Sequence, residues 1–243
     1  GSFAEGIQHL REAIRLSPAM KPALHVSLGG ALAEMGRLGD ASREYERVLE
    51  TYPKHPGARN NYAVALRRNG KVAEAEQLLM ELVADSPRNV DAYNNLSALA
   101  IDRREWPKAE RYARLALDLD DSLPEAWNNL AIAQEEQGRS EESLRSYRRS
   151  LSLNAQYWPA HLNLGILHRK MGRREEALKS FGEALNLVPQ LPLAHYEMGM
   201  LYAQSGDQRE KARNHLNAFL KYAPQDPRGD EVRKLLAELD LAA

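Results

Sequence analysis

The stretch Pro124–Asn154, PEAWNNLAIAQEEQGRSEESLRSYRRSLSLN, is the unit that the rest of the chain repeats. Its segment Trp127-Asn128-Asn129-Leu130-Ala131 recurs at intervals of 34 residues, as Arg59-Asn60-Asn61-Tyr62-Ala63, Tyr93-Asn94-Asn95-Leu96-Ser97 and His161-Leu162-Asn163-Leu164-Gly165. A fixed period of this length is typical of stacked helix–turn–helix repeats. Each unit of such an array packs only on its neighbours, so 243 residues can form one array without a single central core.

Two columns of marker residues divide each repeat into helices. Glycine separates the two halves at Gly36, Gly70, Gly138, Gly172 and Gly206, and Arg104 takes its place in the third full unit. A second column closes the units at Pro53, Pro87, Asp121, Ala155, Pro189 and, one residue late, Pro224. Because proline cannot continue a preceding helix, this column predicts helix ends. Two apolar-periodic segments of about a dozen residues lie between the markers, as expected of amphipathic helices.

The apolar pattern also predicts which residues are buried. In the fourth full unit we expect the first helix to bury Trp127, Leu130, Ala131 and Gln134, and the second to bury Leu144, Tyr147 and Leu151. Small residues recur early in the second helix, where two helices can approach closely: Ala41, Ala75, Ala109, Ser143, Ala177 and Ala212.

The pattern resembles the tetratricopeptide repeat, whose signature is an aromatic residue, Leu-Gly, an aromatic, Ala, Phe and a closing Pro. The best match is the fifth full unit, with Leu164, Gly165, His168, Ala177, Phe181, Ala184 and Pro189. The resemblance covers the chain from about Lys21 to Pro224. It implies an all-α fold, a right-handed superhelical solenoid of helix–turn–helix repeats, in a family used mostly as an interaction scaffold.

We interpret residues 1–243 as a single solenoid: residues 3–18 as the second helix of a truncated repeat, 21–224 as six full repeats and 226–243 as a C-terminal capping helix. Gly1-Ser2 is typical of a cloning scar. Since the truncated repeat lacks its first helix, we expect Phe3, Ile7, Leu10 and Ile14 to be partly uncovered. Either the chain is a fragment of a longer array, or this helix packs against a partner or a second copy in self-association.

Composition excludes several classes of function. Lys+Arg 33 against Asp+Glu 34 leaves a net charge of −1, so no global attraction to nucleic acid follows. The longest apolar runs are far shorter than a membrane span, so we expect no direct membrane insertion. The absence of cysteine removes disulfides and thiol chemistry. It leaves the localisation open between the cytoplasm and, if a signal or lipid anchor was removed, a periplasmic or membrane-associated place.

No motif of an active site, a cofactor site or a metal site is present. There is no H-x-x-x-H pair, glycine-rich phosphate loop or Gly-x-Ser-x-Gly elbow. His25, His161 and His195 share the column of Tyr93 and Trp127, a packing position, and His168 shares that of Leu66 and Tyr202. We therefore expect a protein that is not an enzyme, with no catalytic residues, cofactor or metal.

The strongest candidate for a binding site is the asparagine column Asn61, Asn95, Asn129 and Asn163, which ends where Ser27 and Glu197 replace it. Asparagine is a mediocre helix former, so four in register need a reason. In the family the first helices line a concave groove, where amides can bind a peptide main chain with donor and acceptor together. The row resembles the asparagine ladder in the tetratricopeptide domain of O-linked N-acetylglucosamine transferases, which holds peptides in this manner. Alternatively, the amides bridge neighbouring helices or reflect repeat ancestry.

Three further rows accompany this ladder. Asn60, Asn94 and Asn128 form a second amide row beside it. The apolar row Val64, Ala98, Ile132, Ile166 and Met200, about one turn further on, could supply side-chain pockets or helix packing. Charges of alternating sign follow: Arg67, Arg68, Asp102, Glu135, Glu136, Arg169 and Lys170. They could select a ligand that carries positive and negative groups in different segments, or they could form a solvent-exposed edge without a binding role.

These features predict a non-catalytic protein–protein interaction scaffold or adaptor that binds an extended peptide segment of a partner in its concave groove. Two alternatives stay open. One is the substrate-recruiting arm of a larger enzyme such as a glycosyltransferase. The other is an assembly factor for a bacterial membrane machine, similar to a pilotin lipoprotein.

Overall fold

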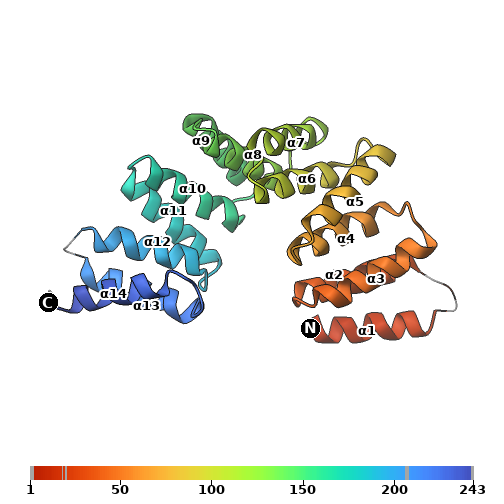
Figure 1. Ribbon diagram of the computed structural model, residues 1–243, viewed down its shortest axis with the longest axis horizontal. Helices are drawn as coiled ribbons and strands as arrows, with labels where there is room; N and C mark the ends of the chain where they lie inside the picture. Colours follow the sequence, from red (N-terminus) through yellow and green to blue (C-terminus); the bar gives the residue numbers. More distant parts are fainter. Residues whose placement is uncertain (1–2, 18, 20, 206–207, 242–243) are drawn as a thin grey trace. The chain divides into compact units, whose positions relative to one another are not determined.

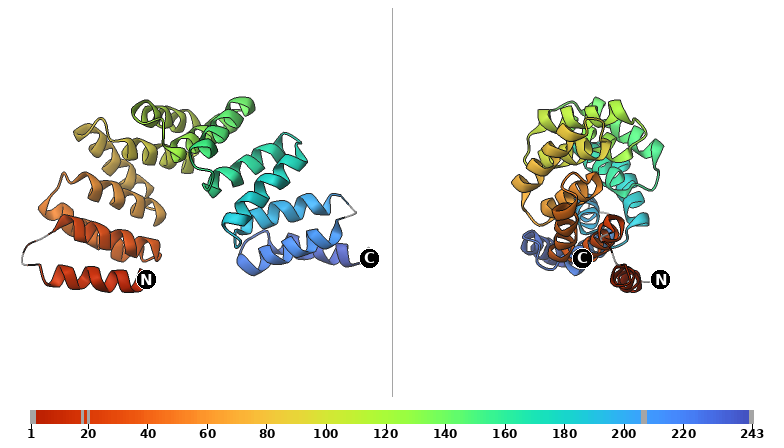
Figure 2. Two further views of the ribbon diagram at one scale, coloured as in Figure 1. Left: turned by 180° about the vertical axis from the view of Figure 1, so that it is seen from behind. Right: turned by 90° about the vertical axis from the view of Figure 1, so that its right-hand side faces the viewer.

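The computed structural model describes residues 3–17, 19, 21–205 and 208–241, and its regular elements in these ranges are all α-helices (Figure 1). The predicted all-α repeat solenoid is confirmed. The chain divides into two compact units, Gly1–Ser122 (unit 1) and Leu123–Ala243 (unit 2). Within each unit, consecutive helices lie side by side and are joined by short turns (Figure 2).

Each repeat contributes a first and a second helix, and the bounds follow the marker columns. Unit 1 contains α1 (Phe3–Arg15), the first helices α2 (Pro22–Glu34), α4 (Pro56–Arg68) and α6 (Val90–Asp102), and the second helices α3 (Leu38–Thr51), α5 (Val72–Asp85) and α7 (Trp106–Leu119). Unit 2 contains the first helices α8 (Pro124–Glu136), α10 (Trp158–Lys170) and α12 (Pro192–Ala203), the second helices α9 (Ser140–Leu153), α11 (Arg174–Leu187) and α13 (Arg209–Tyr222), and α14 (Gly229–Leu241). The division into a truncated repeat, six repeats and a cap stays a prediction.

Proline marks both the starts and the ends of these helices. The first helices α2, α4, α8 and α12 begin at a proline, whose missing N–H is not needed in the first turn. Every second helix from α3 to α13 ends two residues before the closing column, whether proline or, at Asp121 and Ala155, another residue fills it. The repeat therefore keeps its helix ends even where the marker residue has changed.

The turn between the two helices of a repeat requires a left-handed residue. Gly36, Gly70, Gly138 and Gly172 adopt φ between 73° and 79°, and Arg104 adopts φ 59° in the same place. The bonds that close the turn are the same: Arg37 N–H donates to Leu32 O at 2.9 Å, and Glu105 N–H to Ala100 O at 2.8 Å. Arg104 thus occupies a glycine conformation that is strained for an L-residue with a Cβ. The predicted turn at Gly206 lies outside the described residues.

Replacing Arg104 by glycine is expected to raise the free energy of unfolding by about 1 kcal/mol, because the left-handed strain disappears. Urea denaturation followed by circular dichroism measures the change. The reverse exchange, Gly138→Arg, is the matched control and should lower stability by about the same amount. An unchanged midpoint for Arg104→Gly would contradict the strain at this turn.

The two helices of a repeat meet where a small residue faces a large one. A Cβ built on Gly29 would lie 2.5 Å from the ring of Tyr45, and one built on Gly165 would lie 2.6 Å from that of Phe181. Both rings are fully buried. The small residues early in the second helices are fully buried as well: Ala41, Ala75, Ala109, Ser143, Ala177 and Ala212. Glycine at position 165 is therefore required by packing rather than by backbone conformation.

Gly165→Ala should destabilise the protein by roughly 1–3 kcal/mol, because the added methyl group collides with the Phe181 ring. Gly182→Ala is the matched control: it lies inside α11, and its Cβ would meet nothing within 4 Å. That control should be neutral or stabilising by up to about 1 kcal/mol through backbone entropy. Thermal unfolding of both variants tests this; equal effects of the two exchanges would rule out the packing argument.

The structure corrects some burial predictions. In the fourth repeat the predicted core residues are buried apart from Trp127 and Leu151, which are only half-buried. The expectation that Ile7 is partly uncovered was wrong: it is 4% exposed and packs with Leu28, Leu32 and Tyr45. Leu10 and Ile14 pack partly buried against the same residues. The Phe3 side chain lies outside the described residues. Ile7 therefore gives no support to self-association through α1.

The helix α14 packs its apolar residues against α13. Val232 is fully buried and Leu239 is 8% exposed, and both pack with Leu216 and Phe219 of α13. Leu235 and Leu236 are partly buried against the same cluster. The apolar side chains of α14 are thus turned toward α13.

Candidate functional site

The predicted ladder lies on first helices that neighbour one another. In unit 1, α4 lies against both α2 and α6, and in unit 2, α8 lies against α10. Asn61 and Asn95 lie on α4 and α6, and Asn129 and Asn163 lie on α8 and α10. Since equivalent positions are 34 residues apart, each unit brings its own ladder residues into a row on adjacent helices.

Amide–amide hydrogen bonds connect the two asparagine rows in the same way in both units. Asn95 Nδ2 donates to Asn60 Oδ1 at 2.8 Å, and Asn163 Nδ2 donates to Asn128 Oδ1 at 3.0 Å. Asn60 Nδ2 also lies 3.4 Å from Asn61 Oδ1, a long bond. Asn94 and Asn129 are not free either, because each side chain or backbone already interacts with another group. For Asn95 and Asn163, the alternative that amides bridge neighbouring helices is therefore realised.

Exposure varies within each amide row rather than between the rows, since Asn60 and Asn94 are half-buried like most of the ladder. Asn128 is 4% exposed and Asn129 is 9% exposed, whereas Asn61, Asn95 and Asn163 are only half-buried. An asparagine side chain offers two N–H donors and two acceptor lone pairs. The bridging bond uses one donor of Asn95 or Asn163, which leaves a second N–H and the Oδ1 atom. Which amides are buried could not be predicted from the sequence, because burial depends on the neighbouring helix.

The apolar row takes part in helix packing. Ala98 is buried, and Ile132 packs partly buried against the residues around Leu144 and Tyr147. Ile166 packs in the same manner against the residues around Phe181. Val64 is half-buried. Of the two predicted uses, packing is the one for which the contacts are present, and the half-buried members keep an exposed edge.

The alternating charges are paired with one another. In unit 1, Arg67 Nε lies 2.6 Å from Asp102 Oδ2, and Arg68 Nη1 lies 3.6 Å from Glu34 Oε1. In unit 2, Lys170 Nζ lies 2.7 Å from Glu135 Oε1 and 2.9 Å from Glu136 Oε1, and Arg169 Nε lies 2.8 Å from Glu197 Oε2. Arg67 and Arg169, both predicted to bind a partner, are therefore already engaged by neighbouring carboxylates.

Two of these carboxylates are buried. The Glu135 side chain is 7% exposed and also accepts a hydrogen bond from Tyr147 Oη at 3.1 Å. Burial and the charge of Glu135 raise the pKa of Tyr147 well above its usual value. At the ladder position of the last repeat, burial raises the pKa of Glu197, against the opposing effect of Arg169. In unit 2 the alternating charges thus include buried carboxylates, and Glu135 is hydrogen-bonded to the buried Tyr147.

The histidine column has a structural use that also includes an arginine. His161 Nε2 lies 2.9 Å from Ala155 O, and His195 Nε2 lies 3.0 Å from Pro189 O. Arg59, at the same position of an earlier repeat, donates from Nε to Pro53 O at 2.7 Å and binds Asp85 with a second nitrogen at 2.8 Å. This role of Arg59 was not predicted from the sequence. Its place in the column of His161 and His195 was the available signal.

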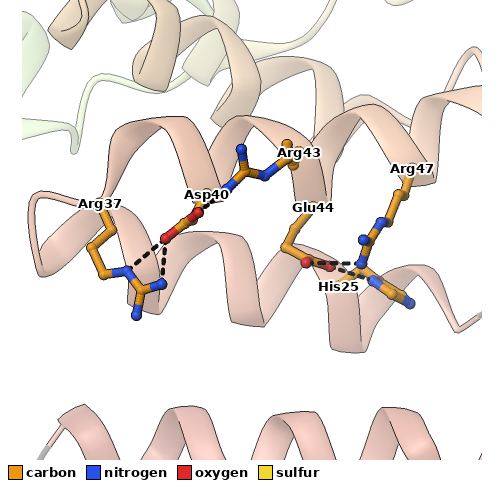
Figure 3. A network of polar contacts seen from close by, with 6 residues as sticks. All are labelled: His25, Arg37, Asp40, Arg43, Glu44 and Arg47. Carbon is orange, nitrogen blue, oxygen red and sulfur yellow. Dashed lines mark hydrogen bonds and ion pairs between the residues drawn. The ribbon is translucent and has the colours of Figure 1, made fainter.

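His25 is held in a polar network between α2 and α3 (Figure 3). It is buried, and its Nδ1 atom lies 2.7 Å from Glu44 Oε2, while Arg47 Nη1 donates to Glu44 Oε1 at 3.1 Å. One turn earlier on α3, Asp40 is paired with Arg37 and Arg43. The interpretation of His25 as a packing residue agrees with its burial, and the bond to Glu44 stabilises the helix pair.

His195 and His215 form a pair of imidazoles between α12 and α13. Their Nδ1 atoms are 3.0 Å apart. Because the Pro189 carbonyl can only accept, His195 Nε2 carries a proton, so His195 Nδ1 accepts from His215 Nδ1–H in the neutral pair. Burial, followed by the effect of His195, lowers the pKa of His215 to about 4. His215 is therefore neutral at pH 7.

This pair predicts a loss of stability in mild acid. The unfolded histidine has a pKa near 6.5, so between about pH 6.5 and 4 the unfolded state binds more protons. The free energy of unfolding is then highest above pH 6.5 and falls by on the order of 1 kcal/mol toward pH 4, after allowance for solvent screening.

Urea denaturation between pH 7 and pH 4 should show a smaller fall for His215→Asn, which retains a donor for His195 but does not titrate. His9→Asn, at an exposed position of α1, is the control and should leave the pH dependence unchanged. Identical pH dependence of parent and His215→Asn would refute the assignment.

Within the described ranges, no group of three or more histidine, aspartate or glutamate side chains could hold a metal ion. No helix in the same part of the chain is both long and apolar enough to cross a membrane.

Models of the tetratricopeptide repeat match residues 32–100, 122–190 and 193–226. The chain belongs to the tetratricopeptide repeat family. Repeats of this family serve as protein-interaction scaffolds, typically without catalysis, and generally bind protein partners. The chain is therefore a protein-interaction scaffold. No curated protein matches its sequence.

Solved structures with this fold include proteins of different length. The chain is similar to one in the APC/C hetero-tetramer Cut9-Hcn1, with a TM-score of 0.86 and 16% identity; the match covers 97% of this chain and 46% of that one. A tetratricopeptide repeat protein from Parabacteroides merdae matches with a TM-score of 0.72 and 19% identity over 98% and 92% of the two chains. YrrB, described as a TPR protein with an unusual peptide-binding site, matches with a TM-score of 0.53 and 18% identity over 78% and 97%. At these identities the likeness shows the fold.

Proposed function

We propose that this chain is a non-catalytic scaffold that binds an extended segment of a partner protein along the amide rows of its first helices. The observation that carries the proposal is the repeated geometry of Asn95 and Asn163. Each is half-buried, and each is held by one N–H bond to the amide on the preceding first helix. The second N–H and the Oδ1 atom of each are the groups that the proposal assigns to the partner.

These groups match the needs of a peptide main chain. An extended segment presents N–H donors and C=O acceptors at regular intervals, and one amide can bind one of each. Asn60 and Asn128 hold the orientation of the ladder amides by accepting from them, so less side-chain freedom is lost on binding. Recognition of this kind depends little on the partner's side chains. Asn60 and Asn128 therefore act as positioning residues in this proposal.

Two likenesses add support. YrrB, which shares the fold, is described as having a peptide-binding site. The asparagine column also resembles the ladder of O-linked N-acetylglucosamine transferases. A recruiting arm of a larger enzyme, or an assembly factor for a bacterial membrane machine, would use the same amide rows. Loss of these amides would therefore impair binding in all three roles.

The double variant Asn95→Ala/Asn163→Ala should weaken partner binding by roughly tenfold or more, since two main-chain contacts of about 1 kcal/mol each are removed. Partners would be captured from an extract of the source cells, purified and titrated by calorimetry against parent and variant. Circular dichroism of the variant should show the parent helix content.

Asn186→Ala is the matched control, because this exposed asparagine lies on the second helix α11, away from the amide rows. It should leave affinity unchanged. Unaltered affinity in a folded double variant would overturn the proposal. Unfolding of the double variant would instead assign the rows a structural role alone.

A further inference from the structure

A row of charges lies on the same helix face as the ladder. Seven residues make nearly two full turns of an α-helix, so a residue seven positions after a ladder position lies on the same face. In unit 1 these positions are Glu34, Arg68 and Asp102, counted from Ser27, Asn61 and Asn95. In unit 2 they are Glu136 and Lys170, counted from Asn129 and Asn163. A partner held by the ladder would pass beside this row.

In unit 1 the charges of this row are cancelled by neighbours on adjacent first helices. Arg68 on α4 pairs with Glu34 on α2 at 3.6 Å. Asp102 on α6 pairs with Arg67 on α4 at 2.6 Å. Two acidic and two basic side chains therefore leave no net charge. All four are partly or well exposed, so the pairs lie where a ligand would meet them.

Unit 2 pairs its charges in a similar way, although its two cations meet three carboxylates, of which Glu135 and Glu197 are largely buried. Lys170 on α10 pairs with Glu135 and Glu136 on α8, at 2.7 and 2.9 Å. Arg169 pairs with Glu197, the residue that takes the ladder position in α12. Every cation of the row thus has a carboxylate from a neighbouring first helix.

We infer that the partner segment is uncharged where it lies against the first helices: a neutral, extended peptide bound mainly through its main chain. This inference rests on the proposed function. A charged side chain of the partner would have to displace a carboxylate or a cation already in contact, and the displaced group would lose its own partner. The exchange of one exposed ion pair for another gains little. A free patch of one sign, which would favour a charged partner, is absent from these described pairs.

The test uses three sets of capped peptides of about ten residues, long enough to span roughly 33 Å when extended. One set is built from uncharged residues, and the other two replace alternate positions by glutamate or by lysine. Affinities are measured by fluorescence anisotropy for the parent chain and for Asn95→Ala/Asn163→Ala, at about 50 and 500 mM NaCl. The neutral set should bind best to the parent, with less than about a twofold change between the two salt concentrations.

Two charge variants at one exposed ion pair provide matched controls. Arg67→Gln releases Asp102 and should shift preference toward the lysine set, while Asp102→Asn releases Arg67 and should shift it toward the glutamate set. Each shift is expected to be about threefold to tenfold and to vanish at high salt. Unchanged preferences in both variants would overturn the inference.

Strongest binding of a charged set to the parent, weakened about tenfold by salt and lost in the asparagine double variant, would also overturn the inference while leaving the proposed function intact. Binding that the asparagine exchanges do not affect, or no binding by any set, would overturn the proposed function and the inference with it.

Discussion

The contact of a large second-helix side chain with a small first-helix residue is the interaction on which the arrangement of each repeat depends. Gly29 leaves room for the Tyr45 ring, and Gly165 leaves room for that of Phe181. Where the first helix has serine instead, Ser97 Oγ of α6 donates to Ala109 O of α7 at 2.8 Å, across the equivalent helix pair of another repeat. This close approach sets the distance between the helices, and stacking of the pairs then brings equivalent residues together on neighbouring first helices.

Because the repeats stack in register, a residue repeated every 34 positions forms a row across neighbouring first helices. The side-chain amides of such a row can both stabilise the stack and bind a ligand. An asparagine ladder stabilises the array when one amide donates to the preceding first helix, as Asn95 does to Asn60 and Asn163 does to Asn128. It can also bind a main chain with the donor and the acceptor that remain. The two uses are compatible because an amide has more hydrogen-bonding sites than the bridging bond occupies. The ion pairs also result from register, since side chains of opposite charge at nearly equivalent positions lie on neighbouring first helices and pair there.

Much of the fold could be predicted because its signals are local. The marker columns predicted the helix ends, including the turn at Arg104, where a residue other than glycine adopts φ 59°. The alternation of Arg67 and Asp102 in the sequence contained the signal for their pairing. The burial of Ile7 could not be predicted from the apolar pattern alone, because the pattern identifies an apolar face without identifying what covers it. The same holds for Trp127, which is only half-buried although its column is a packing position.

The sequence by itself determined the period, the helices and the membership of each row, because propensity, proline and glycine act over a few residues and repeat every 34 positions. Only the tertiary structure decided how each row is used. Whether an amide donates to a neighbouring helix or faces outward depends on a separation of about 3 Å between residues 35 positions apart. Whether Arg169 is available to a partner depends on Glu197 from the next first helix. Distances of this kind result from how helices pack, and helix packing is absent from the local pattern of the chain.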